Sequence, residues 1–222
     1  MRAKELVPIL AEIYGVPFET AFMIDRSISE AGLRARGRGR SLPEMARREA
    51  IIFLVACMTT VKPTKAGQEV QEWMQADGWI QDYNPDAPEE RTDDDDYEPG
   101  FVWNYHMKKA LDLLPLYTTP NNDEFARINL IDFLMAVCAT LQANHLTGDE
   151  FKFEISVSHG WAAVSVNDRT SGGYSELRFQ TEAGGQDPVS YETQISKSAV
   201  VYGDALMALA VRTIDPVAGS AD

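Results

Sequence analysis

Apolar residues recur at helical spacing near the start of the chain. Positions three or four residues apart form one face of an amphipathic helix. The positions that follow this spacing are Leu6, Ile9, Leu10 and Ile13. Gly15 suits a helix C-terminal cap, and Pro17 cannot continue a helix interior. The pattern predicts a first helix over residues 3–14.

A second helix is expected from Pro17 or Phe18 to Ala31, with Gly32 as its cap. Phe18, Ala21, Phe22 and Ile28 fall near one stripe of this helix.

A third helix is expected to begin at Pro43, because proline suits the first helical position, and to end near Thr60. Residues 50–58 are apolar almost without interruption, which indicates a helix at the centre of the core. Residues 64–75 predict a fourth helix.

Residues 77–100 interrupt this pattern with prolines and a run of acids, Asp93 to Asp96. Like charges repel and little of this stretch is apolar, so it is interpreted as an acidic linker or a mobile loop. It divides the chain into a helical basic head, residues 1–76, and an α+β domain, residues 101–216.

The second part changes from helical to alternating periodicity. Helices are expected over residues 101–114 and 123–144. Strands are expected over 151–157, 161–166, 174–180 and 189–195, and a final helix from Ser198 to Ile214. The predicted fold class is α+β: an N-terminal helical, helix-turn-helix-like domain, then helices packed on a small antiparallel meander sheet.

Charge is unevenly distributed along the 222 residues, whose net charge is −14. Residues 1–65 carry 11 basic and 7 acidic side chains, which gives +4, and the remainder carries −18. The dense positive stretch is residues 32–48, with a single acid, Glu44. Its six arginines are Arg34, Arg36, Arg38, Arg40, Arg47 and Arg48. This polarity favours two surfaces with different partners.

No motif for catalysis or metal binding is present. The histidines His106, His145 and His159 have unrelated surroundings, and no zinc-protease, nucleophile-elbow or phosphate-loop pattern occurs. The expectation is a non-enzymatic protein without metal or cofactor. Cys57 and Cys138 lie in apolar helical contexts, which is typical of buried free thiols in a cytoplasmic protein. No window is long and apolar enough to predict a membrane span.

The six arginines are predicted to bind double-stranded DNA. Guanidinium groups bind phosphates through forked donors, Gly37 and Gly39 permit close approach, and a helix N-terminus adds free N–H groups. In general character, though not in any motif, a basic head on an acidic body resembles accessory proteins of phages and mobile elements. A DNA-binding regulator of such an element is the first hypothesis, with a homodimer as an option.

Two other classes remain open. An acidic body can imitate nucleic acid and occupy a basic groove on a host protein complex, as an anti-defence inhibitor does. A phage structural or scaffold protein would bind other proteins alone. The arginine stretch could also pair with acids of the same molecule.

Overall fold

The computed structural model describes most of the chain in eight segments. These are residues 1–35, 44–81, 117–119, 122–144, 151–157, 160–167, 174–182 and 198–213. The expected helix at 101–114, the expected strand at 189–195, most of the acidic stretch and Arg36, Arg38 and Arg40 lie outside these segments.

The described strands form one seven-stranded sheet in the order β2-β3-β1-β6-β5-β4-β7, and every neighbouring pair is antiparallel. The strands are β1 (Asp77–Gln81), β2 (Tyr117–Thr119), β3 (Asn122–Asn129), β4 (Phe151–Ser156), β5 (Trp161–Asn167), β6 (Tyr174–Gln180) and β7 (Ser198–Tyr202). The α+β class and the meander β4-β5-β6 are therefore confirmed.

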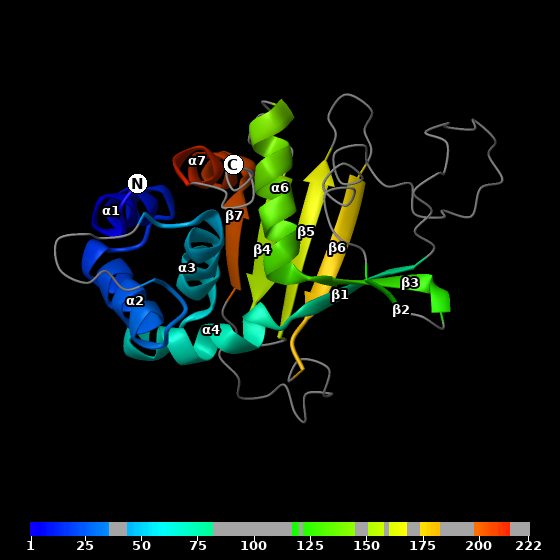
Figure 1. The fold of residues 1–222 in the computed structure, drawn as a ribbon, viewed down its shortest axis with the longest axis horizontal. Coiled ribbons are helices and arrows are strands. Elements are labelled where there is room, and N and C mark those ends of the chain that lie inside the picture. Colours follow the sequence, from blue (N-terminus) through cyan, green and yellow to red (C-terminus); the bar gives the residue numbers. More distant parts are fainter. Residues whose placement is uncertain are drawn as a thin grey trace, which may run out of the picture.

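Six α-helices accompany the sheet within the described residues. They are α1 (Ala3–Ile13), α2 (Phe18–Glu30), α3 (Arg47–Thr59), α4 (Ala66–Met74), α6 (Leu130–Asn144) and α7 (Gly203–Arg212). In Figure 1, α1 to α4 gather beside the β7 edge, whereas α6 crosses over the central strands. None of the described helices is long and apolar enough to cross a bilayer.

The apolar run at residues 50–56 is buried on every side, with at most 3% of each residue exposed. Helix α3 can be apolar all round because other helices and the sheet surround it. The same core continues through α6 into the sheet. The described core is thus continuous across the proposed division into head and body, and that division stays a prediction.

The alternating strands place one face of the sheet against the helices. Phe153 on β4 lies opposite Val164 on β5, and Val164 lies opposite Leu177 on β6, all three buried. Phe179 packs its ring 5.5 Å from that of Phe133 on α6. The strand predictions for this region are confirmed.

The expected start of the third helix at Pro43 is wrong, because α3 begins at Arg47. Glu44 forms a β-bridge with Arg2, and the amide of Met45 donates to the carbonyl of Met1 at 2.9 Å. Tertiary hydrogen bonds to the N-terminus thus keep this segment extended.

Three further element boundaries differ from expectation. Residues 123–129 were expected in a helix but belong to β3, which lies between β1 and β2, and α6 begins only at Leu130. Residues 198–202 pair with β4 as a strand instead of opening the last helix. Residues 77–81, expected in the linker, form β1 inside the sheet. Sheet pairing supplied by distant strands overrides local periodicity at all three places.

Candidate nucleic-acid interface

A single carboxylate, that of Glu49, holds both ends of the arginine loop, defined here as residues 36–45. Its Oε1 accepts the backbone N–H of Ala35 at 2.7 Å, and its Oε2 accepts that of Ala46 at 2.9 Å. Glu49 is the third residue of α3, where a carboxylate commonly binds the amide that precedes the helix. Ala35 and Ala46, on either side of the loop, therefore lie close together.

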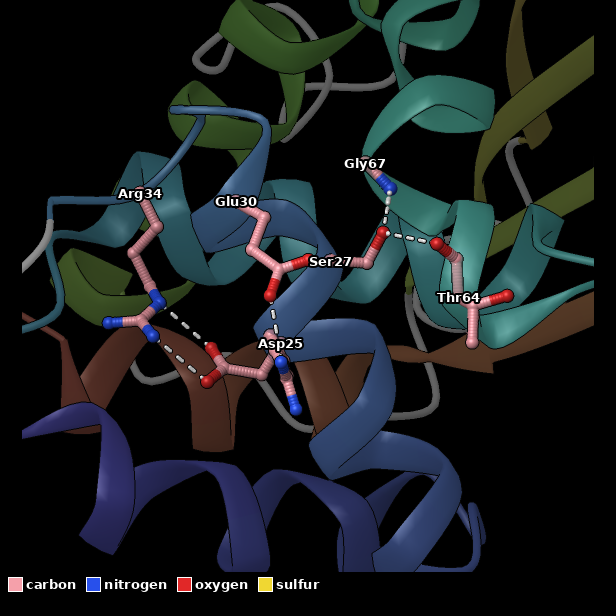
Figure 2. Close-up of polar contacts among 7 residues, drawn as sticks. Asp25, Ser27, Glu30, Arg34, Thr64 and Gly67 are labelled. Carbon is pink, nitrogen blue, oxygen red and sulfur yellow. Dashed lines mark hydrogen bonds and ion pairs between the residues drawn. The ribbon is translucent and has the colours of Figure 1, made fainter.

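Arg34 stands at the departing end of the loop and is tied to α2. Its Nε lies 2.8 Å from Oδ1 of Asp25, and its Nη2 donates to Oδ2 at 2.9 Å, a forked pair drawn in Figure 2. The two side chains are only 16% and 11% exposed. Burial raises the pKa of Asp25, and the neighbouring Arg34 guanidinium opposes that rise.

The C-terminal half of α2 is fixed on its other side by α4 and by the short 3₁₀ helix Pro63–Lys65 that precedes it. Ser27 Oγ accepts the amide of Gly67 at 3.0 Å and donates to the carbonyl of Thr64 at 3.2 Å (Figure 2). Gly67 allows this approach, because a Cβ there would lie 2.4 Å from the Ser27 carbonyl oxygen. The base of the loop is thus held by packed helices.

Arg47 points into the protein. It is 3% exposed, and its Nη2 donates to Oε1 of Gln142 at 2.6 Å and to the carbonyl of Ala210 at 3.2 Å. Gln142 belongs to α6, and Ala210 lies in the last turn of α7. A positive charge near a helix C-terminus interacts favourably with the helix dipole. Arg47 therefore joins three helices, and a bound polyanion would not reach it.

Arg48 lies at the surface and pairs with Asp132 near the start of α6, with its Nη1 2.5 Å from Oδ1. About half of each side chain is buried, since 46% and 45% remain exposed. The carboxylate neutralises much of the field that Arg48 would present to a phosphate.

The three described arginines of the predicted site are thus not brought together. Arg34 faces α2, Arg47 enters the core and Arg48 faces α6. At the N-terminus of α3, Glu49 occupies the amide of Ala46, one of the N–H groups close to the predicted phosphate site. Sequence reasoning missed Glu49, although a glutamate three residues after the N-cap, here Ala46, is a usual signature of a helix start.

An apolar groove beside the loop base was also missed. It has a volume of about 580 Å³ and runs between α1 and α2, with Arg34 at one end. Phe18 and Phe22 on its rim are 51% and 54% exposed, and their ring centroids are 6.2 Å apart. The expected stripe of α2 is therefore split: Ala21 and Ile28 face the core, whereas the two phenylalanines face solvent.

Both cysteines are free, as expected, and Cys138 is buried whereas Cys57 is partly exposed. Burial raises the pKa of Cys138 to about 12, with a smaller opposing effect from Arg47. The thiolate is thus scarcely populated at neutral pH, and Cys138 is a poor nucleophile.

Comparisons with protein-family models, with curated proteins and with solved structures find no match for this chain.

Proposed function

We propose that this chain is a DNA-binding accessory or regulatory protein, of the kind carried by phages and mobile elements. In this proposal, double-stranded DNA is bound through phosphate contacts from Arg36, Arg38 and Arg40. The observation that supports it most is the grip of Glu49 on both ends of the loop that carries these arginines. A loop with anchored ends loses less conformational freedom when it binds, so more of its interaction energy appears as affinity.

The other three arginines of the region have supporting roles in this proposal. Arg34 and Arg47 hold the loop base and the helices behind it, through Asp25 and Gln142 respectively. Arg48 adds a partly neutralised charge at the edge of the surface. Cationic groups held apart in this way leave the loop as the main source of phosphate affinity.

The proposed contact is to the DNA backbone through the loop between α2 and α3, because α3 is buried in the core and cannot serve as a recognition helix. Residues 31–46 separate these helices, whereas a helix-turn-helix joins its helices by about 3–4 residues. We therefore propose that the loop, rather than a recognition helix, makes the main contacts with DNA. Backbone contacts of this kind bind DNA with little sequence preference.

Binding of a fluorescent duplex, followed by anisotropy, tests the proposal. Replacing Arg36, Arg38 and Arg40 with alanine should abolish binding at physiological salt. The matched control replaces Arg2, Lys62 and Lys65, which also removes three positive charges from exposed positions of the head. If the control loses as much affinity as the loop variant, net charge explains binding and the loop does not.

The acidic part of the chain keeps the protein-binding alternative open, because residues 66–222 carry −18. Purification from a host lysate with and without nuclease separates the classes. A DNA-binding protein loses its co-purifying material after nuclease treatment. An acidic inhibitor retains a basic host complex, and a scaffold forms assemblies by itself.

A further inference from the structure

The exposed face of α2 carries an apolar patch at its centre. The large apolar side chains there are Phe18, Phe22 and Met23, of which 51%, 54% and 41% is exposed. They lie within two turns of one helix, and Phe18 and Phe22 contact each other. Contiguous exposed apolar residues of this size commonly mark an interaction surface.

Opposite charges lie at the two ends of this patch. Glu19 is exposed at the N-terminal end, and Arg26 is exposed at the C-terminal end, where it also pairs with Glu30 at 2.8 Å. If a second α2 crosses antiparallel, with the two-fold axis between Phe22 and Met23, residue i meets residue 45 − i. This places Glu19 beside Arg26 of the second copy, and the symmetry repeats the pair at the other end.

We propose that the α2 face is a self-association surface whose occupant is α2 of a second copy of this chain. Phe22 then packs against Met23 of the second copy, and two Glu19–Arg26 ion pairs flank the apolar centre. The groove between α1 and α2 continues from the patch, with Val7 and Pro8 on its far wall, and accommodates the ring of Phe18 from the second copy.

The overall charge distribution supports approach through this face. Residues 1–65 carry +4 and the remainder −18, so copies that meet through their bodies would repel each other. In Figure 1, α2 lies on the side of the molecule away from β1, β2 and β3. Contact through α2 therefore joins the least acidic parts of the two copies.

Sedimentation velocity of the full chain, without nucleic acid, measures this association over a wide concentration range. Wild-type protein should convert from monomer to dimer, and Phe22→Glu should remain monomeric. Val61→Glu is the matched control, because it adds the same charge at an apolar residue that is 68% exposed outside the patch. The control should dimerise as the wild type does.

A charge swap tests the antiparallel register. Glu19→Arg or Arg26→Glu alone creates two like-charge contacts and should weaken dimerisation by about tenfold. The double variant Glu19→Arg, Arg26→Glu restores both pairs and should recover wild-type association. A wild type that stays monomeric, a dimer unaffected by Phe22→Glu, or a double variant that is not rescued would overturn the proposal. The assay contains no DNA, so its result is independent of the proposed function.

Discussion

Replacement of Arg47 by methionine tests the assignment of this residue to the core. Methionine retains most of the aliphatic volume but removes both hydrogen bonds, to Gln142 Oε1 at 2.6 Å and to the Ala210 carbonyl at 3.2 Å. The bond to the Ala210 carbonyl is buried, whereas the bond to Gln142, an exposed residue, is partly buried. A hydrogen bond to a charged group contributes about 1.5–3 kcal/mol. The expected loss for the two is therefore about 3 kcal/mol, a large part of the roughly 5–15 kcal/mol that stabilises a typical domain.

Arg48→Met is the matched control, since it makes the same substitution at the adjacent residue. The Arg48 side chain is 46% exposed, and its pair with Asp132 resembles surface pairs that contribute about 0.2–1 kcal/mol.

Urea unfolding measures both variants. With a slope of about 3 kcal/mol per molar urea, Arg47→Met should lower the unfolding midpoint by about 1 M. Arg48→Met should lower it by a third of that or less. Equal, small shifts for the two variants would refute the structural role of Arg47 and return it to the set of possible DNA contacts.

Three further predictions concern the base of the arginine loop. Glu49→Gln keeps one acceptor but turns an N–H donor toward the other amide. We therefore expect the free energy of unfolding, measured with urea, to fall by about 1–2 kcal/mol and duplex binding to weaken. Unchanged binding would show that the loop ends need no anchor. Gly67→Ala forces a Cβ to within 2.4 Å of the Ser27 carbonyl and should cost about 1–3 kcal/mol, whereas an unchanged melting temperature would contradict the close contact of α2 with α4. The folded-state pKa of Asp25 is raised above 3.8, so ionisation of Asp25 opposes folding as the pH rises through the range just above 3.8. The free energy of unfolding of the wild type, relative to that of Asp25→Asn, should therefore fall across this range. A rise would contradict burial as the cause of the raised pKa.

Local periodicity correctly predicted helices, whose backbone hydrogen bonds are internal, and strands in which apolar and polar residues alternate regularly. The apolar run of α3 and the alternating residues of β4, β5 and β6 were recognised because burial on all sides, or on one face, leaves a direct mark on the sequence. Helix α2 was located correctly, but the sequence did not show which side chains of its stripe are buried. The sequence does not show whether phenylalanines on one face of a helix pack against the same molecule or against another one.

Elements that depend on distant partners were the ones missed. Residues 122–129 contain alternation that is too weak to outweigh the neighbouring helical pattern, and they become a strand because β1 and β2 lie on either side. Residues 198–202 form a strand because β4 offers an edge. Pairing across such separations is a property of the assembled sheet, which no local window contains.

The arginine stretch was recognisable, but the individual roles of its members were not. The closely spaced arginines predicted one shared binding site. In the structure, however, Arg34 binds Asp25 and Arg47 binds Gln142. Glu49, which binds the amides at both loop ends, is negatively charged, whereas the region was identified by its positive charge. The chemistry of a cluster therefore depends on partners up to 163 residues away along the chain.

The dependence of duplex affinity on salt concentration tests the central claim, that the arginine loop contacts DNA phosphates, most directly. Each phosphate contact changes the slope of log K against log salt by about −0.9, so three loop arginines contribute about −2.7. We predict that alanine at Arg36, Arg38 and Arg40 removes this contribution, whereas alanine at Arg2, Lys62 and Lys65 leaves the slope unchanged. A slope that is the same in the wild type and the loop variant would contradict the account.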